Sequence, residues 1–364
     1  MNRNLDPETV ASIVLDRAIA PPAVLPASLS GRRILVTGAA GSIGSKLCLR
    51  LAALNAGREP GCLLALDRAE NSIFRLSREL GSELGRTAIA TVGDVCDTDL
   101  TEELIARHGI DTVIHAAAYK HVPLMEEHPI EAIRNNVVGT FSVVRAAIRQ
   151  SVGTLLLVST DKAANPHGIM GRTKRAAELI VAAAPDLRRG AIRLGNVLGS
   201  EGSVWTSFVE QIRTGQPVTI THPDACRYFV TAGEAVDFIL RALSLVSQGE
   251  ILVPHMGEPV RIADFARRLG AVMGHRDMEM RVIGLRAGDK LLEDLKDSEA
   301  DFVPSSDAGL RMIREGAGSW SEVESWIARL NDALVARDAL SASDWLSGFA
   351  GHFALSSTRY LPAR

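Results

Sequence analysis

Apolar residues in the first two hundred positions form short continuous runs, separated by longer segments in which they recur every three or four residues. The continuous runs predict strands at 33–37, 62–67, 88–92, 112–116, 155–159 and 191–194. The periodic segments predict helices at 42–54, 71–80, 100–107, 130–148 and 173–184. Strands that are apolar throughout are typical of a sheet covered by helices on both faces. The alternation of strand and helix therefore predicts an α/β fold with a doubly wound parallel sheet of the Rossmann type.

The alternation loosens beyond residue 200, where short apolar runs at 218–221 and 251–253 lie among helical patterns. We therefore predict three parts. Residues 1–30 form an N-terminal helical extension with a proline-rich connector, and 31–200 form a dinucleotide-binding domain. Residues 201–364 form mainly a smaller substrate-binding lobe, from which about 230–255 return to the main sheet.

A glycine-rich loop, Thr-Gly-Ala-Ala-Gly-Ser-Ile-Gly, joins the first predicted strand to the first helix. Gly38 permits the tight turn, Gly41 lets the backbone approach a pyrophosphate, and Gly44 lets the helix pack on the strand. Ser42 and Ile43 lie at the start of the helix, where free amide groups attract phosphate. The alternative is a tight turn without a ligand, but a strand before and a helix after favour a dinucleotide site.

Acidic residues follow the second and third predicted strands. Asp67 ends the second strand, where a carboxylate accepts hydrogen bonds from the ribose hydroxyls of NAD and repels a 2′-phosphate. Arg68 follows it and could hold that phosphate instead, so NAD is favoured but NADP stays open. Asp94 and Val95 follow the third strand, where the carboxylate can accept from the adenine amine or cap the next helix.

Composition narrows the functional classes. The chain has 364 residues, of which 46% are hydrophobic and 23% charged, and its net charge is −3. No basic block indicates a nucleic-acid partner, and no apolar run has the length of a membrane span. There is no signal-peptide pattern, and neither the four cysteines nor the histidines have metal-ligand spacing. We therefore expect a cytoplasmic enzyme with a small-molecule substrate and no metal.

Several further motifs give a specific family resemblance, and they are His-Ala-Ala-Ala-Tyr-Lys-His-Val-Pro (115–123), Asn-Val-Val-Gly-Thr (136–140), Ser-Thr-Asp-Lys-Ala (159–163), Met-Gly-Arg-Thr-Lys-Arg (170–175), Arg-Leu-Gly-Asn-Val-Leu-Gly-Ser (193–200), Thr-His-Pro (221–223) and Gly-Leu-Arg-Ala-Gly-Asp-Lys-Leu (284–291). From about residue 8 to 350 the chain resembles extended short-chain dehydrogenases/reductases of the UDP-N-acetylglucosamine 4,6-dehydratase family. This family also has long forms with an N-terminal membrane region. Residues 8–30 resemble the connector that precedes the catalytic domain in the long form. The resemblance therefore implies that this chain corresponds to the soluble part of the long form.

The resemblance implies a catalytic set around the fifth strand. Asp161 would protonate the hydroxyl that leaves carbon 6, and Lys162 would remove the proton from carbon 5. Thr160, Asp161 or a water would relay the proton of the carbon 4 hydroxyl. Most of the superfamily has tyrosine where this chain has Met170, as the long-form dehydratases do. Lys174 would hold the nicotinamide ribose. The alternative for Asp161 and Lys162 is a solvated turn at a strand end.

The same resemblance implies binding residues around this set. The loop Ala116, Ala117 and Ala118 would contact the cofactor. The implied substrate contacts are Lys120, His121, Asn136, Asn196, Arg227 and Glu293. Arginine suits a diphosphate because its planar fork binds phosphate oxygens in pairs. For most of these residues, a helix cap or a surface salt bridge is the alternative.

Two other functions fit the same fold. A nucleotide-sugar epimerase shares the cofactor and the transient 4-keto sugar, but it does not need the Asp161–Lys162 acid–base pair. A non-catalytic regulator that senses the cofactor does not need Lys174. The sequence therefore favours an NAD-dependent 4,6-dehydratase that acts on UDP-N-acetylglucosamine or a related nucleotide sugar, and the family leads us to expect a homo-oligomer.

Overall fold

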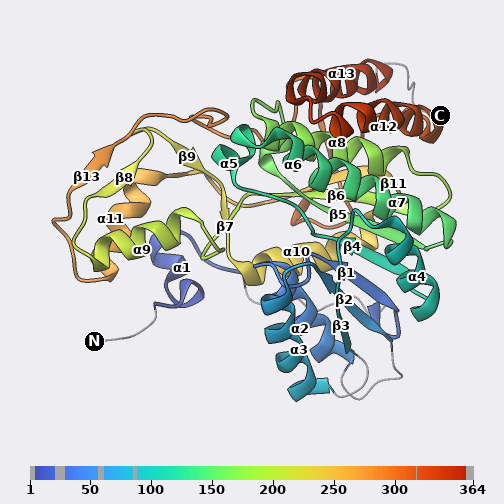
Figure 1. Ribbon diagram of the computed structural model, residues 1–364. Helices are drawn as coiled ribbons and strands as arrows, with labels where there is room; N and C mark the ends of the chain where they lie inside the picture. The colour runs from blue at the N-terminus through green and yellow to red at the C-terminus, as the bar shows by residue number, and fades with distance from the viewer. Residues whose placement is uncertain (1–4, 21–28, 56–60, 85–87, 317, 358–364) are drawn as a thin grey trace.

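The computed structural model describes residues 5–20, 29–55, 61–84, 88–316 and 318–357 (Figure 1). The proline-rich connector predicted within 1–30 falls largely in 21–28, which lies outside the described residues. Helix α1 (Pro7–Leu15) is the helical part of that extension, and Asp6 caps it by accepting from the backbone of Glu8 and Thr9.

One sheet of nine strands, counted over the described residues, runs through the larger part of the molecule in the order β14-β15-β11-β6-β5-β4-β1-β2-β3. The strands are β1 (Ile34–Thr37), β2 (Leu63–Asp67), β3 (Ala88–Val92), β4 (Thr112–His115), β5 (Thr154–Thr160), β6 (Arg188–Leu194), β11 (Gln248–Pro254), β14 (Phe302–Pro304) and β15 (Leu310–Ile313). The strands from β3 to β11 are parallel, and β15 and β14 add an antiparallel edge. The predicted doubly wound parallel sheet is confirmed.

Helices cover both faces of this sheet (Figure 1). One face packs under α2 (Gly44–Asn55), α3 (Glu70–Leu84) and α10 (Ala232–Leu245). The other packs under α4 (Thr98–His108), α7 (Gly139–Arg149) and α8 (Ile169–Ala183). Strands β1 and β4 are buried along their whole length, as their continuous apolar sequences require.

Two helices differ from the sequence prediction. The helix predicted over 130–148 is α6 (Pro129–Ile133), a π-helical turn η3 (Arg134–Val138) and then α7. Helix α8 begins at Ile169, four residues before the predicted start at Thr173. The side chain of Asn136, in the middle of the π-turn, is hydrogen-bonded to Tyr119 in the loop after β4 and to Thr173 on α8. Met170 and Lys174 consequently lie on one helix, one turn apart.

A smaller lobe has its own core, made by α1, α9 (Val204–Arg213), α11 (Ile262–Val272) and β8 (Val218–Ile220) (Figure 1). Strand β8 pairs with β13 (Met280–Val282), and α1 packs against α11. Arg17, just after α1, forms a two-pronged ion pair with Glu234 at 2.8 Å. The packing of α1 on α11 makes the N-terminal helix part of this lobe, and the Arg17–Glu234 pair ties it to α10 on the main sheet.

The C-terminal part of the chain differs from the prediction that 201–364 form mainly a lobe. Strand β11 lies within the segment of about 230–255 that was expected to return to the main sheet, whereas β14 and β15 join this sheet from outside that segment. Helices α12 (Trp320–Val335) and α13 (Ala339–Ser357) pack on the α8 side of that sheet. Their apolar faces bury Val323, Ile327 and Phe353 in the same core as α8. The lobe is correspondingly smaller than predicted.

Across the described residues, no helix combines the length and the apolar character needed to cross a lipid bilayer.

Candidate active site

The glycine loop lies at the point where the strand order reverses, because β2 and β4 flank β1 on opposite sides. Ligands of open α/β sheets bind at such a point, beyond the carboxyl ends of the strands. Gly38 has a φ of +64°, and a Cβ added to it would lie 2.6 Å from the backbone of Ala117. The loops after β1 and β4 therefore touch, and only glycine fits at this contact.

A cavity of about 180 Å³ opens beside this contact. It is lined by most of the predicted cofactor residues, namely Gly38, Gly41, Asp67, Arg68, Asp94, Val95, Ala116, Ala117 and Ala118. Leu66, Gly93, Tyr119 and Asn135 also line it, and none of these was predicted as a cofactor residue from the sequence. Leu66 is the residue before Asp67 at the end of β2, and Tyr119 lies in the loop after β4, so their positions near strand ends are the signal that could have identified them. The cavity and its glycine cradle fit the diphosphate and adenosine of a dinucleotide.

Asp67 organises this cavity. Its Oδ2 accepts from the Ala40 amide of the glycine loop at 2.9 Å, and its Oδ1 accepts from the Ala69 amide at 2.9 Å. Arg68 donates to Asp94 at 3.4 Å, and its guanidinium lies 4.4 Å from the centre of the Tyr119 ring. The cap of α4 is Asp97, so Asp94 does not have the alternative role of capping that helix.

The predicted acid–base pair lies at the carboxyl end of β5. Asp161 is fully buried, and its Oδ1 accepts from the Thr160 hydroxyl at 2.9 Å and from Lys162 Nζ at 3.0 Å. Its Oδ2 is buried without a hydrogen-bond partner in the described part of the chain. A buried acceptor without a partner is costly, so this atom is available for a ligand or a proton. The side chain of Lys162 is 21% exposed.

Three residues that are distant in sequence complete a cluster around Lys162. Asn196 Oδ1 accepts from Nζ at 3.0 Å, and Glu293 Oε1 lies 3.6 Å from it. Arg227 Nε also lies 3.6 Å from Glu293 Oε1. The rest of the Arg227 guanidinium donates to the backbone carbonyls of 226, 290 and 291. In this structure Arg227 thus holds the segment that carries Glu293.

The charge of this cluster sets the resting state of Lys162. Burial acts to lower the pKa of Lys162, but the Asp161 and Glu293 carboxylates outweigh burial and hold its pKa above the ordinary value. The role of base that the family resemblance implies for Lys162 requires a neutral amine. The amine must therefore lose its proton within the site before it can act as one.

Helix α8 brings Met170 and Lys174 against β5. Met170 is buried, and Lys174 Nζ donates to the backbone carbonyl of Val158 at 2.8 Å. Burial lowers the pKa of Lys174 to about 8, although Glu178 opposes part of this effect. Asn136 donates to Thr173 and Tyr119 at 3.0 Å and accepts from the Tyr119 amide at 2.8 Å. The polar atoms of the Asn136 side chain are hydrogen-bonded within the protein. In this structure Asn136 therefore holds α8 against the loop after β4.

The low pKa of Lys174 predicts a stability effect in the protein without ligands. The folded protein binds fewer protons than the unfolded chain between pH 8 and the ordinary lysine value, so this group makes stability rise with pH in that window. In Lys174→Met the rise should be absent. The difference in unfolding free energy between variant and wild type should change by roughly 3 kcal/mol across the window. Urea unfolding at several pH values measures it, and parallel curves for the two proteins would contradict it.

Lys120 and His121 lie beside the loop of Glu201 and Gly202. Burial lowers the pKa of Lys120, and Glu201 opposes it. A Cβ at Gly202 would overlap the His121 ring. The Glu201 amide donates to the Ser42 hydroxyl at 3.1 Å. The loop after β7 (Asn196–Val197) therefore contacts the glycine loop through Glu201 and Ser42.

A buried ionic network supports the cluster. Arg193, on β6, is fully buried and donates to Glu178 at 2.9 and 2.8 Å and to Asp297 at 2.9 Å. Asp297 also accepts from the backbone N–H of Asn165 at 2.8 Å. The network joins β6, α8 and the segment after Glu293, so these three elements hold fixed relative positions.

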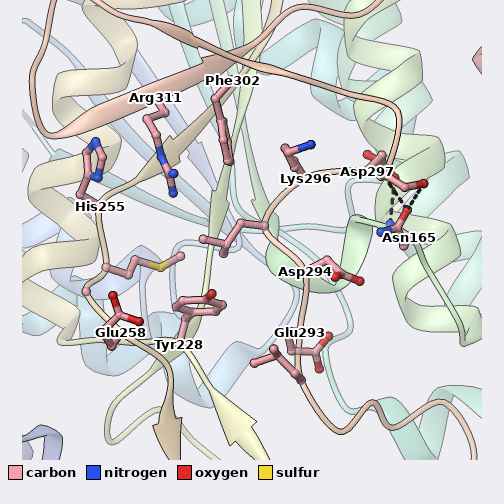
Figure 2. A pocket seen from close by; sticks show the side chains of 15 residues that line it. Asn165, Tyr228, His255, Glu258, Glu293, Asp294, Lys296, Asp297, Phe302 and Arg311 are labelled. Atoms are coloured by element: carbon pink, nitrogen blue, oxygen red, sulfur yellow. Dashed lines mark hydrogen bonds between the residues drawn. The ribbon is translucent and has the colours of Figure 1, made fainter.

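A second cavity, of about 680 Å³, lies between the segment 292–298, the loop after β11 and the edge strands β14 and β15. Figure 2 shows Tyr228 and Glu293 toward one end of it and Arg311 and Phe302 toward the other. Arg311 lies over the Phe302 ring at 3.9 Å. Glu293 thus lies on the wall between this cavity and Lys162.

Within the described residues, no three side chains of the metal-binding types are grouped as a metal site requires.

The parallel sheet, the glycine loop at its switch point and the lysine of α8 define the molecule as an extended short-chain dehydrogenase/reductase. Several solved structures share this fold. They include Pen from Bacillus thuringiensis, with a TM-score of 0.71 and 25% identity over 83% of this chain and 98% of that one. They also include DesIV, a dTDP-glucose 4,6-dehydratase from Streptomyces venezuelae, with a TM-score of 0.64 and 21% identity over 72% and 88%.

The chain belongs to the polysaccharide biosynthesis protein family, whose family model matches residues 34–311. It is 41% identical over 274 residues to EpsC, a probable polysaccharide biosynthesis protein of Bacillus subtilis, and 41% identical over 281 residues to CapD, a capsular polysaccharide biosynthesis protein of Staphylococcus aureus. These matches cover 73% and 75% of this chain but 45% and 46% of the relatives. The chain thus spans about half the length of these two relatives.

Two shorter relatives have names that state an activity. A UDP-N-acetylglucosamine 4,6-dehydratase (inverting) of Campylobacter jejuni is 33% identical over 280 residues, which cover 74% of this chain and 79% of the relative. A UDP-glucose 4-epimerase of Rickettsia canadensis is 33% identical over 290 residues, which cover 76% and 81%. Both reactions act on nucleotide sugars, and identity alone does not separate them.

Proposed function

We propose that this protein is an NAD-dependent 4,6-dehydratase of a nucleotide sugar, with UDP-N-acetylglucosamine or a related nucleoside diphosphate hexose as substrate. The observation that carries the proposal is the pair of Asp161 and Lys162 at the carboxyl end of β5, where a carboxylate with one unpartnered oxygen lies beside a partly exposed amine. Elimination of water needs an acid and a base at neighbouring carbons, and this pair supplies both.

The residues divide the chemistry as follows. A nicotinamide dinucleotide, which the glycine loop, Asp67 and Lys174 would hold, would supply the hydride chemistry at carbons 4 and 6. The Thr160 hydroxyl, which donates to Asp161, relays the proton of the carbon 4 hydroxyl to that carboxylate. Asp161 then protonates the hydroxyl leaving carbon 6, and Lys162 removes the proton from carbon 5. Asn196, Lys120 and His121 are proposed for the nucleotide diphosphate.

The choice of NAD over NADP rests on the end of β2. The carboxylate of Asp67 lies in the cofactor cavity, where it would repel a 2′-phosphate. Arg68, the residue that could hold such a phosphate, is instead bonded to Asp94 and stacked on Tyr119. Both observations favour two free ribose hydroxyls.

Epimerisation is the second candidate, because Rickettsia relatives named as UDP-glucose 4-epimerases match this chain over most of their length. An epimerase needs a base at carbon 4 and no acid–base pair for carbons 5 and 6. Met170 cannot accept a proton, whereas Asp161 and Lys162 are both in place. The residues therefore favour dehydration.

Incubation of the protein with NAD and UDP-N-acetylglucosamine, followed by mass spectrometry and NMR, distinguishes the candidates. Dehydration is expected to give a product that has lost one water and gained a methyl group at carbon 6. A product of unchanged mass with inverted configuration would establish the epimerase instead. An absence of turnover over a panel of nucleotide sugars would rule out both enzymes, and NADP in place of NAD tests the cofactor assignment.

A further inference from the structure

Glu293 is a buried carboxylate that the reaction described above does not use. It is 4% exposed, and its Oε1 lies 3.6 Å from Lys162 Nζ and 3.6 Å from Arg227 Nε. Its Oε2 is buried and accepts no hydrogen bond from any described residue, as is also true of Asp161 Oδ2. Two carboxylates, each with one unsatisfied oxygen, thus flank a single ammonium group.

The proposed reaction requires two carboxylates because it displaces two protons at once. Oxidation at carbon 4 releases the proton of its hydroxyl. Conversion of the Lys162 ammonium into a free amine releases a second. Asp161 receives the first through Thr160, because Asp161 must later deliver a proton to the hydroxyl that leaves carbon 6. Asp161 is then already protonated and cannot accept the proton of Lys162.

We propose that Glu293 takes the proton of Lys162 and stores it during the elimination, a role that rests on the proposed dehydratase function. An N–H bond of Lys162 breaks and an O–H bond of Glu293 forms. The free amine takes the proton of carbon 5 while the carbon 6–oxygen bond breaks, and Asp161 supplies the proton that completes the water. Lys162 later returns its proton to carbon 5 and recovers the stored one from Glu293.

The proton count closes over this cycle. The departing water carries the oxygen and hydrogen of the carbon 6 hydroxyl together with the proton that came from the carbon 4 hydroxyl. At the end Asp161 and Glu293 are ionised and Lys162 is charged, as at the start. No further acid, base or reductant is needed.

The segment around Glu293 is anchored on both sides, as a proton-transfer partner requires. Before it, Lys290 donates to the Ala164 carbonyl at 2.9 Å and to Asp294 at 2.9 Å. After it, Asp297 is held by Arg193 and the Asn165 amide. Figure 2 shows the contact between Asp297 and Asn165 further along the segment that carries Glu293. Ala164 and Asn165 directly follow the short helix that begins at Asp161, so both sides of the cluster share one support.

The test is Glu293→Gln, which keeps the shape of the side chain and removes the proton acceptor. The rate of water loss at saturating substrate should fall by about 100-fold, in the range of general acid–base effects. The KM for the nucleotide sugar should change little. Oxidation at carbon 4, measured through the absorbance of the reduced cofactor, should persist. Glu293→Asp should recover part of the rate. Glu299→Gln, the same substitution at an exposed position of this segment, is the matched control and should resemble wild type.

A second measurement needs neither substrate nor cofactor. Carbon-13 NMR of labelled lysine should show a lower pKa for Lys162 in Glu293→Gln, because one of the two carboxylates that raise it is gone. An unchanged Lys162 titration, or water loss within tenfold of wild type, would overturn the role. A raised KM with equal losses of oxidation and elimination would make Glu293 a nucleotide contact instead. A wild-type protein that dehydrates no nucleotide sugar overturns the proposed function and this role together, whereas an unimpaired Glu293→Gln in a working dehydratase overturns the role alone.

Discussion

Lys162→Ala is expected to abolish water loss and leave cofactor binding intact. The amine of Lys162 lies between Asp161 and Glu293, and its removal leaves two buried carboxylates that cannot remove a proton from carbon 5 as an amine would. Loss of a positioned base typically costs 10² to 10⁴ in rate, and we expect about 10³. The cofactor cavity is lined by residues of 38–135, so the substitution should not reach it.

Single-turnover mass spectrometry and a titration with NAD separate the two effects. The oxidised 4-keto sugar should form in Lys162→Ala without elimination. Lys162→Met, which fills more of the space, should behave alike and shows that the loss is not a packing effect. Lys46→Ala is the control, because Lys46 is about half exposed and pairs with Glu8 of α1. Turnover of Lys162→Ala within tenfold of wild type would assign the base to another residue.

The main sheet could be predicted from sequence because its signal is local. A strand buried on both faces must be apolar throughout, so the runs that end at Thr37, Asp67 and Val92 mark strands. The glycine loop is equally local, since its three glycines and the flanking elements are contiguous. The prediction of a cofactor site at the first strand therefore needed no knowledge of distant contacts.

The irregular elements depend on contacts that a linear pattern does not contain. The π-turn at 134–138 is stabilised by hydrogen bonds from Asn136 to Tyr119 and Thr173, which lie far apart in sequence. The start of α8 was missed because His167 and Gly168 have the composition of a loop. The Ile169 amide is nonetheless bonded to Glu126 on α5 (Val122–Glu127), which begins the helix earlier.

The candidate site was predictable where it follows a strand and unpredictable where loops converge. Thr160 ends β5, and Asp161 and Lys162 follow it directly, so the sequence places them at the ligand edge of the sheet. Glu293 lies in an irregular segment whose position depends on Arg193, Arg227 and Lys290. The resemblance singled out Glu293, but only the packed structure brings it to Lys162.

Gly44→Ala is expected to eliminate NAD binding and to destabilise the fold. A Cβ at Gly44 would lie 2.8 Å from Ala39 Cα and 2.9 Å from the Gly38 carbonyl carbon, and closer still to the Gly38 oxygen. These are backbone atoms, so no change of rotamer relieves the overlap. The loop would have to move, but Gly38 already touches the Ala117 backbone. Overpacking of this kind costs about 3 kcal/mol, and the displaced amides would no longer converge on a diphosphate.

Thermal unfolding and NAD titration of Gly44→Ala measure the two effects, and we expect affinity to fall at least about 100-fold, a free-energy change of roughly 2.7 kcal/mol. Gly81→Ala is the matched control. Gly81 lies in α3 with no atom near an added Cβ, so alanine there should leave binding unchanged and stabilise the helix slightly. Far-ultraviolet circular dichroism distinguishes a folded Gly44→Ala that has lost the cofactor from an unfolded one. Wild-type NAD affinity in this variant would show that the loop binds no diphosphate, and the assignment of the cofactor to the β1–α2 turn would then be wrong.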